Sequence, residues 1–277
     1  MGNEHDPPAE YRSRRDEIAA LAAGADRPAH VIEYTATEDA TWRAVAEALD
    51  VAWRDHACAE LLDARDRLAL AADRVPQLTE VSERLGHISR FGYRAVPGLV
   101  PVTEFFSSLA SGVFLSTQYV RWEGSPLYTP EPDVIHELVG HANLLAHPEL
   151  AELHRLAGAA MTRLEHERSR KFLADVFWFS VEFGVVDEPG DHGREWRAYG
   201  AGLLSSHGEV GWFADHAEVR PLDIAAMGTT AYDIDHYQPV LFGGRSLSEV
   251  VDVVGGFFAD VTDHEVERLT QRAQVNG

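Results

Sequence analysis

The sequence predicts a mainly α protein, a single domain of packed helices with a few short strands. Apolar residues recur at helical spacing, as Trp42, Val45, Leu49 and Trp53 do. Strand patterns are few, and the clearest covers residues 238–242. No internal repeat or low-complexity segment divides the chain. Together these observations favour one helical domain over a sheet-based fold.

The predicted elements follow from local signals along the chain. Residues 1–30 are polar and contain three prolines, so we expect a mobile N-terminal tail with one short helix ahead of a domain over residues 31–277. Thr37 precedes two acids as the expected cap of the first long helix. Ser246 and Glu249 form a capping-box pattern before the last one. Further helices are expected at 81–88, 104–119, 148–170 and 172–183, with loops at 95–101, 126–132 and 184–193.

The charge balance narrows the range of partners. The 277 residues include 24 basic and 45 acidic side chains, and the formal net charge of -21 disfavours nucleic acid and anionic membranes as partners. The single cysteine, Cys58, excludes an internal disulfide and fits a reducing cytoplasm. The N-terminus has no signal-peptide pattern, and no apolar run approaches the ~20 residues of a membrane span. We therefore expect a cytoplasmic protein.

Two histidines in the segment 132–141, His136 and His141, are candidate metal ligands. On a continuous α-helix their spacing of five turns ~140° net, so the two rings leave different faces. Zinc proteases use a spacing of four, and Gly140 stands where that motif needs its second histidine. A spacing of five serves a metal when His136 lies near a helix end, which the prolines at 130 and 132 indicate. From spacing alone, one surface and one core histidine is the commoner arrangement.

Glu182 is the third candidate ligand and lies in an apolar run at residues 177–183. Two neutral imidazoles and one carboxylate hold a divalent iron on one face and leave the opposite positions open. Spacings of four, three and four residues separate Lys171, Asp175, Trp178 and Glu182. This spacing also fits one polar face of an amphipathic helix. However, the surrounding phenylalanines would enclose the carboxylate, which then needs a cation or hydrogen-bond donors. The residue pattern alone leaves both interpretations open.

Four blocks of the sequence closely resemble the pterin-dependent aromatic amino acid hydroxylases. They are residues 117–121 (TQYVR), 128–141 (YTPEPDVIHELVGH), 178–184 (WFSVEFG) and 199–206 (YGAGLLSS). The resemblance runs from about residue 31 to about residue 258 and is strongest to the short bacterial members that hydroxylate phenylalanine. It implies the family's catalytic-domain fold over residues 31–277. The regulatory domain and the C-terminal tetramerisation helix of the family have no counterpart, which favours a monomer.

The resemblance implies a role for each matched residue. His136, His141 and Glu182 would bind iron(II), and Arg121 would pair with the carboxylate of the substrate. Other matched positions would line the amino acid site: Tyr128, Thr129, Trp178, Phe183, Gly202, Ser205 and Ile234. A further set would bind the tetrahydropterin, with Phe105 stacked on its ring: Gly98, Val100, Phe105, Glu137 and Phe177. No catalytic residue beyond the metal ligands is implied.

The implied activity is hydroxylation of L-phenylalanine to L-tyrosine by O2, with iron(II) and a tetrahydropterin as cofactors. Trp178 is bulkier than the phenylalanine usual in tryptophan hydroxylases, and Ile234 stands where tyrosine hydroxylases carry an aspartate. Phe183 and Gly202 keep the pattern of the para-hydroxylating members. The departures from the family concern the pterin contacts more than the iron site: Leu115, Val102, Phe177 and four to five extra residues between 184 and 199.

Three other functions stay compatible with these residues. The enzyme could hydroxylate another aromatic amino acid or ring position, namely tryptophan, tyrosine or the meta position of phenylalanine. A zinc hydrolase would use Glu137 as its base with the same two histidines. A non-catalytic amino-acid-binding protein would keep phenylalanine binding after Glu182→Ala and would show no turnover.

Overall fold

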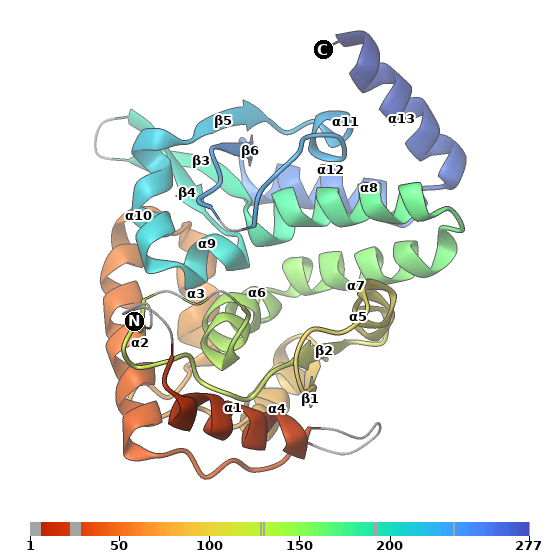
Figure 1. Ribbon diagram of the computed structural model, residues 1–277. Coiled ribbons are helices and arrows are strands. Elements are labelled where there is room, and N and C mark those ends of the chain that lie inside the picture. Colours follow the sequence, from red (N-terminus) through yellow and green to blue (C-terminus); the bar gives the residue numbers. More distant parts are fainter. Residues whose placement is uncertain are drawn as a thin grey trace, which may run out of the picture.

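Two small sheets lie on opposite sides of the central helix α7 in the computed structural model (Figure 1). Helix α7 packs against α5 on one side and against α8 and α12 on the other. The structure describes residues 7–22, 29–127, 129, 131–190, 193–234 and 236–276. Its helices and strands are α1 (Ala9–Leu21), α2 (Ala36–His56), α3 (Ala59–Leu68), α4 (Leu78–Ile88), β1 (Gly92–Ala95), α5 (Val102–Ala110), β2 (Val113–Ser116), the π-helix η1 (His136–Ala142), α6 (Asn143–Leu145), α7 (Pro148–Arg163), α8 (Glu167–Phe177), the π-helix η2 (Trp178–Glu182), β3 (Val185–Gly190), β4 (Gly193–Ala198), α9 (Ala201–Ser205), α10 (His207–His216), β5 (Glu218–Pro221), α11 (Ile224–Met227), β6 (Val240–Gly244), α12 (Leu247–Asp260) and α13 (Asp263–Asn276).

The two sheets hold the segments that flank the candidate site. Strands β1 and β2 are parallel, and β2 leads directly into the 117–121 block. The larger sheet has the order β4-β3-β6-β5, in which β3 is antiparallel to β4 and parallel to β6, and β5 is parallel to β6. Strand β3 begins three residues after Glu182. Each sheet therefore fixes the chain next to one part of the site.

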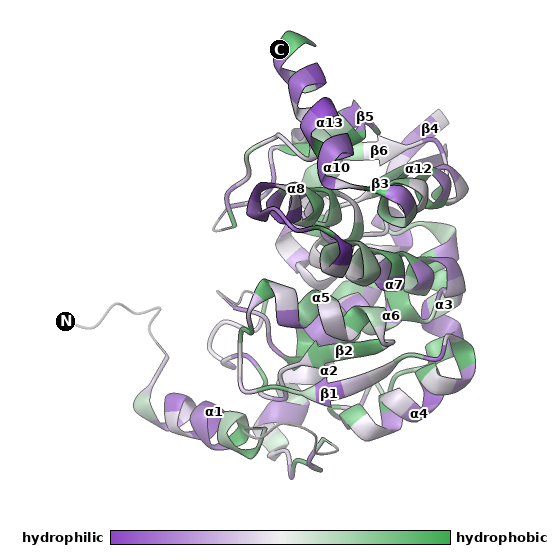
Figure 2. Ribbon diagram, turned by 90° about the vertical axis from the view of Figure 1, so that its right-hand side faces the viewer, coloured by the Kyte–Doolittle hydropathy of each residue, from purple (hydrophilic) through white to green (hydrophobic). Residues whose placement is uncertain are grey.

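The expected apolar positions of the first long helix form part of the core. Trp42, Val45, Leu49 and Trp53 are all buried on α2. Both buried indole N–H groups have hydrogen-bond acceptors. Trp42 Nε1 donates to the carbonyl of Ala71 and Trp53 Nε1 donates to that of Leu204, each at 2.9 Å. Figure 2 shows hydrophobic colouring on the inner strand β2 and hydrophilic colouring over much of α13. The mainly α fold class is thus confirmed.

The N-terminal segment contains the short helix that the sequence predicts. Helix α1 buries Ile18, and the hydroxyl of Tyr11 donates to the carbonyl of Val120 at 3.1 Å. Arg15 pairs with Glu131 at 2.6 Å, so the helix is attached to the body of the protein. Residues 1–6 and 23–28 lie outside the described residues. The mobility of the tail and the domain boundary at residue 31 stay predictions.

Two predicted elements were wrong. The helix expected over residues 104–119 ends at Ala110, because the chain turns at Gly112 with a φ of 72°, and strand β2 follows. The loop expected at 184–193 contains β3 and the start of β4 instead. Pro189 is tolerated in β3 because only Val185 and Val186 of that strand pair with β6.

Two helix boundaries also differ from expectation. Thr35, two residues before Thr37, is the cap of α2 and forms a capping box with Glu38. The helix expected over 148–170 divides after Arg163, because the backbone N–H groups of Glu165 and His166 donate to the carboxylate of Asp263 at 3.0 Å each. Within the described ranges, no helix has the length and apolar character required to cross a membrane.

Candidate metal centre and adjoining cavity

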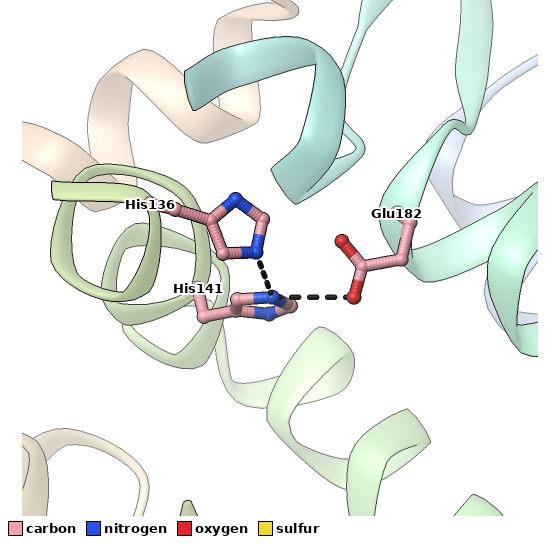
Figure 3. A group of neighbouring side chains, drawn as sticks. All are labelled: His136, His141 and Glu182. Carbon is pink, nitrogen blue, oxygen red and sulfur yellow. Dashed lines mark hydrogen bonds and ion pairs between the residues drawn. The ribbon is translucent and has the colours of Figure 1, made fainter. Parts of the chain in front are cut away.

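His136 and His141 lie on the π-helix η1. In a π-helix each N–H bonds to the carbonyl five residues back, and the wider turn brings residues five apart nearer to one face than an α-helix does. The rotation of ~140° expected for an α-helix therefore does not apply. The two Nε2 atoms are 3.2 Å apart (Figure 3). His136 lies in the first turn of the helical segment that begins at Val134, near a helix end as the sequence predicts.

Gly140 allows η1 to lie directly against α9. A Cβ at Gly140 would be 2.7 Å from the carbonyl oxygen of Ala201, so a larger residue would push the two elements apart. This close approach brings Ser205 of α9 to His136, where Ser205 Oγ is 2.8 Å from His136 Nδ1. The glycine between the two histidines thus helps to position one of them.

Ser205 fixes the tautomer of His136. Ser205 Oγ also lies 2.8 Å from the carbonyl oxygen of Ala201, and that carbonyl can only accept, so the hydroxyl proton points there. Ser205 then accepts a hydrogen bond from Nδ1–H of His136. The lone pair of His136 is therefore on Nε2, which faces His141 and Glu182 (Figure 3).

Glu182 reaches the histidines from the second π-helix, η2, where the N–H of Phe183 bonds to the carbonyl of Trp178 at 2.9 Å. Its Oε1 is 3.2 Å from His141 Nε2. Lys171 is exposed and pairs with the buried Asp175 at 2.6 Å, whereas the carboxylate of Glu182 points toward the two histidines, so Lys171 and Glu182 do not belong to one polar face of the helix. Ligand atoms of His136, His141 and Glu182 all lie within 4.8 Å of one another.

Burial and neighbouring charge set the protonation of this cluster. Burial, followed by the charge of His141, lowers the pKa of His136 to about 4, so its imidazole is neutral at pH 7. Burial alone would raise the pKa of Glu182, but the charge of His141 and its hydrogen bond lower that pKa to about 2. Burial and the charge of Glu182 instead raise the pKa of Glu137 well above its ordinary range. The cluster therefore presents a neutral imidazole and an ionised carboxylate, the forms that bind metal ions.

Arg121 and Asp133 form a buried ion pair next to the cluster. Arg121 NH2 lies 2.8 Å from Asp133 Oδ1, and its Nε and backbone N–H donate to Asp133 Oδ2 at 3.0 and 2.7 Å. Asp133 Oδ1 also accepts from the backbone N–H of His136 at 3.1 Å. Asp133 was not predicted as a site residue, although an aspartate just before an apolar helical run is a cap signal.

A cavity of about 330 Å³ opens beside the three clustered side chains. His136, His141 and Glu182 all reach its wall. The five residues predicted to bind the pterin line the same cavity: Gly98, Val100, Phe105, Glu137 and Phe177. Leu115 and Val102, two of the departures from the family pattern, line it as well. The structure thus brings the predicted metal and pterin residues together in one space.

Aromatic rings form the wall of the cavity nearest η2. Trp178 lines the cavity and is stacked on Tyr232, with centroids 4.4 Å apart and planes at 11°. Phe183 lies beside Trp178 at 4.6 Å. Gly202 leaves room for this ring, because a Cβ there would be 2.7 Å from Phe183 Cζ. Tyr232 was missed by the sequence analysis, since its partner Trp178 is distant in the chain and no local pattern connects them.

Other predicted substrate residues are not at the cavity wall. Ile234 is 72% exposed, because the Gln238 amide binds the carbonyls of Asp233 and His236 and holds the loop outward. Ile234 is therefore not among the residues that line this cavity, and its contact with the substrate ring stays a prediction. The hydroxyl of Thr129 donates to the carbonyl of Glu131 at 2.7 Å, within its own loop. Tyr128 lies outside the described residues.

Comparison with known proteins identifies the family. A family model described as biopterin-dependent aromatic amino acid hydroxylase matches residues 3–269. This chain belongs to that family. It is 46% identical to phenylalanine 3-hydroxylase of Streptomyces coeruleorubidus over 263 residues, which cover 94% of this chain and 92% of that protein. It is 40% identical to tyrosine 3-monooxygenase of Drosophila melanogaster over 87% of this chain, but it spans only 42% of that protein's length.

The fold of this hydroxylase is also similar to that of a solved relative. A crystal structure of phenylalanine hydroxylase from Chromobacterium violaceum, with bound iron(III) and 7,8-dihydrobiopterin, has a TM-score of 0.81 and 29% identity, covering 92% of this chain and 97% of that one. The predicted family, its catalytic-domain fold and its pterin dependence are confirmed. The roles of single residues, the amino acid and the ring position stay predictions.

Proposed function

We propose that this hydroxylase uses iron(II) and a tetrahydropterin to hydroxylate L-phenylalanine with O2. The observation that carries the proposal is the convergence of His136, His141 and Glu182 at the wall of an aromatic-lined cavity. The iron and dihydrobiopterin bound to the Chromobacterium violaceum enzyme support the same cofactors here.

The three side chains fit an iron(II) ion. His136 Nε2 bears a lone pair, and Glu182 is ionised, so acceptor atoms surround His141 Nε2 at 3.2 Å on both sides. A proton on His141 Nε2 would form a good hydrogen bond to only one of these two acceptors, whereas a divalent cation would bind all three ligand atoms. Two histidines and one carboxylate on one face leave open coordination positions, which is the arrangement of non-haem iron(II) oxygenases. Here the open positions would face the cavity.

Iron and the tetrahydropterin together supply the activated oxygen atom, and the chain's residues orient the reactants around it. Phe105 is the stacking surface for the pterin, held edge to face against Phe114 and Phe106 at 5.4 and 5.6 Å. The carboxyl of Glu137 is the polar group on the same wall and serves the hydrogen-bonding edge of the pterin. The apolar lining limits access of water to the reacting atoms.

Arg121 is proposed to bind the carboxylate of the amino acid. Asp133 occupies its Nε and one hydrogen of NH2, and the carbonyl of Pro126 lies 3.4 Å from NH1. The guanidinium has five N–H donors, so two stay available for a substrate carboxylate. Trp178, stacked on Tyr232, is proposed to lie against the aromatic ring of that substrate.

The proposed ring position is carbon 3, with carbon 4 as the second candidate. Similarity supports carbon 3, because the Streptomyces coeruleorubidus and Drosophila melanogaster relatives are both named for hydroxylation at position 3. The pattern at Phe183 and Gly202, which led the sequence analysis to L-tyrosine as product, supports carbon 4. The two candidates differ only in where the ring lies against the same wall, so product analysis separates them.

The other functions have less support. A zinc hydrolase needs Glu137 as a base, but burial raises the pKa of this carboxyl well above its ordinary range, which disfavours the ionised form that a base requires. A non-catalytic binding protein has no need of three converging metal ligands. A monomeric state and a cytoplasmic location, both expected from the sequence, are parts of this proposal.

An aerobic assay of the iron-loaded protein with phenylalanine and a tetrahydropterin tests the function. The products are separated against meta-tyrosine and para-tyrosine standards, and tyrosine and tryptophan are assayed in parallel. We expect oxygen-dependent formation of meta-tyrosine, no product under anaerobic conditions and none from Glu182→Ala. Para-tyrosine as the main product would select the second candidate. Product formation without oxygen, or equal turnover by Glu182→Ala, would contradict the proposed function.

A further inference from the structure

His154 is a fully buried histidine that the proposed reaction does not use. It lies on α7 and is 0% exposed. Its Nδ1 is 2.8 Å from the carbonyl oxygen of Leu150, which can only accept, so Nδ1 carries the proton. The Nε2 atom is then a bare acceptor. It has no hydrogen-bond partner among the described residues.

His141 has a buried ring N–H that lacks an acceptor. Its Nε2 is directed at His136 and Glu182, so binding a metal through Nε2 places the ring proton on Nδ1. This Nδ1 is buried and also lacks a partner within the described part of the chain. The first ligand, His136, has such a partner in Ser205. The second ligand therefore has a donor without an acceptor, and His154 has an acceptor without a donor.

The rings around His154 leave one candidate partner. Its centroid is 6.1 Å from that of Phe91, 6.3 Å from Phe114, 5.6 Å from Phe177 and 6.1 Å from His141. Phenylalanine has no hydrogen-bonding atom, so of these four rings only His141 can donate to His154. Leaving a buried acceptor without a hydrogen bond destabilises the folded protein, and a phenylalanine would fill the same space without that cost. A histidine here thus calls for a specific partner.

We propose that His154 is a positioning residue for the metal ligand His141. Its Nε2 accepts the Nδ1–H of His141, through one bridging water or directly after a small movement of the rings. Histidines that bind metal nearly always donate their second ring N–H in this way, which fixes the ring and raises its basicity. The inference rests on the proposed metal centre and assigns to His141 what Ser205 does for His136. It involves no change in the protonation of either ring.

Cobalt(II) binding to single variants of the full chain tests this role. Glutamine at position 154 can place an acceptor near the position of Nε2, whereas asparagine replaces only Nδ1 and its bond to Leu150. Phenylalanine removes both atoms and keeps the packing. The dissociation constant is measured from the visible absorption of bound cobalt(II) in competition with a chelator. Phe258→Leu, a change in the buried face of α12, is the control for a damaged core.

We expect His154→Phe and His154→Asn to bind cobalt(II) about 10–100-fold more weakly than the wild type. His154→Gln should lie within a few-fold of the wild type, and Phe258→Leu should bind as the wild type does. Thermal unfolding of the metal-free proteins gives a second readout. His154→Phe should unfold at the same temperature as the wild type or higher, because it removes a buried acceptor, although it binds metal more weakly.

Two results would overturn the inference while leaving the proposed function intact. One is an unchanged cobalt(II) affinity in His154→Phe. The other is an equal loss in all three variants and in Phe258→Leu, which would show a purely structural role. Failure of the wild type to bind cobalt(II) would instead remove the proposed metal centre, and this inference with it.

Discussion

Asp133 connects Arg121 to the helix that carries the candidate metal ligands His136 and His141. Its carboxylate accepts three hydrogen bonds from Arg121, at 2.7, 3.0 and 2.8 Å, and a fourth from the backbone N–H of His136 at 3.1 Å. The side chains are 3% and 0% exposed. The group proposed to bind the substrate carboxylate is thus fixed relative to the first metal ligand by one aspartate.

Changing Asp133 to asparagine should lower the stability of the fold and weaken binding of the amino acid. Removing one partner of a buried ion pair costs about 3–5 kcal/mol, because the other charge is left uncompensated. We expect a lower unfolding temperature and a Michaelis constant for the amino acid raised about 10-fold or more. The exposed pair Asp187 and Arg194 is the matched control, and Asp187→Asn should change stability by less than about 1 kcal/mol. A normal Michaelis constant in Asp133→Asn would remove Arg121 from the substrate site.

Ser205→Ala should lower the affinity for the metal. Without Ser205 Oγ, 2.8 Å from His136 Nδ1, the imidazole can exchange tautomers and rotate. Loss of such a contact to a metal ligand typically weakens metal binding about 10–100-fold. Chelator competition with iron(II) or cobalt(II) measures the change. Thr41→Ala removes a buried hydroxyl on α2 that belongs neither to the three clustered side chains nor to the cavity wall, and it should leave the affinity unaltered. Equal affinity of Ser205→Ala and the wild type would show that the tautomer is fixed by other contacts.

Trp178→Phe should shift the substrate preference toward tryptophan. The smaller phenylalanine ring enlarges the cavity next to Tyr232, on which Trp178 is stacked in the wild type. Differences of this size in an apolar pocket change specificity about 10-fold or more. The ratio of kcat/KM for tryptophan to that for phenylalanine measures the shift. An unaltered ratio would place the substrate ring elsewhere in the cavity.

Glu209→Gln should stabilise the protein above neutral pH. Burial raises the pKa of Glu209 to about 7, although the N–H of Gln238, 2.7 Å from its Oε1, acts in the opposite direction. Because the folded pKa lies above the unfolded one, stability falls as pH rises from about 4.5 to about 7, by on the order of 3 kcal/mol. Glutamine keeps the acceptor for Gln238 and has no charge to bury.

We measure the difference in unfolding temperature between Glu209→Gln and the wild type. This difference should be more favourable to the variant at pH 8 than at pH 5, by roughly 5 °C. Scanning calorimetry at the two pH values measures it. Asp187→Asn, on the surface, serves as the control and should show no such pH-dependent gain. If the difference in unfolding temperature between Glu209→Gln and the wild type were the same at both pH values, the carboxylate of Glu209 would be solvated in the folded protein.

Local sequence patterns predicted the elements whose stability is mostly local. The apolar spacing of Trp42 to Trp53 gave α2 correctly, and Ser246 begins α12 by accepting from the N–H of Glu249. Strand β3 was predicted as part of a loop, because the glycines, acids and proline of residues 184–193 are typical of turns. It is a strand because it pairs with β4 and with β6, which is about fifty residues further along the chain. Long-range pairing of this kind leaves no local signal.

The metal ligands were predicted from the family resemblance rather than from their spacing. The spacing of five from His136 to His141 argues against a shared face on an α-helix, and π-helices are too rare to be expected from one sequence. The substrate contact of Ile234 was also predicted from the resemblance and stays a prediction, since Ile234 is exposed and Gln238 donates to the carbonyls of Asp233 and His236 on either side of it.

The π-helix between His136 and His141 ties the metal site to the exact number of residues in this short segment. Removing one residue would give the spacing of four that zinc proteases use on an α-helix, and adding one would send the two imidazoles toward different sides of the backbone. Single-residue insertions and deletions here should therefore damage the protein more than most substitutions. In the proposed metal centre, the number of residues between the two histidines matters as much as their type.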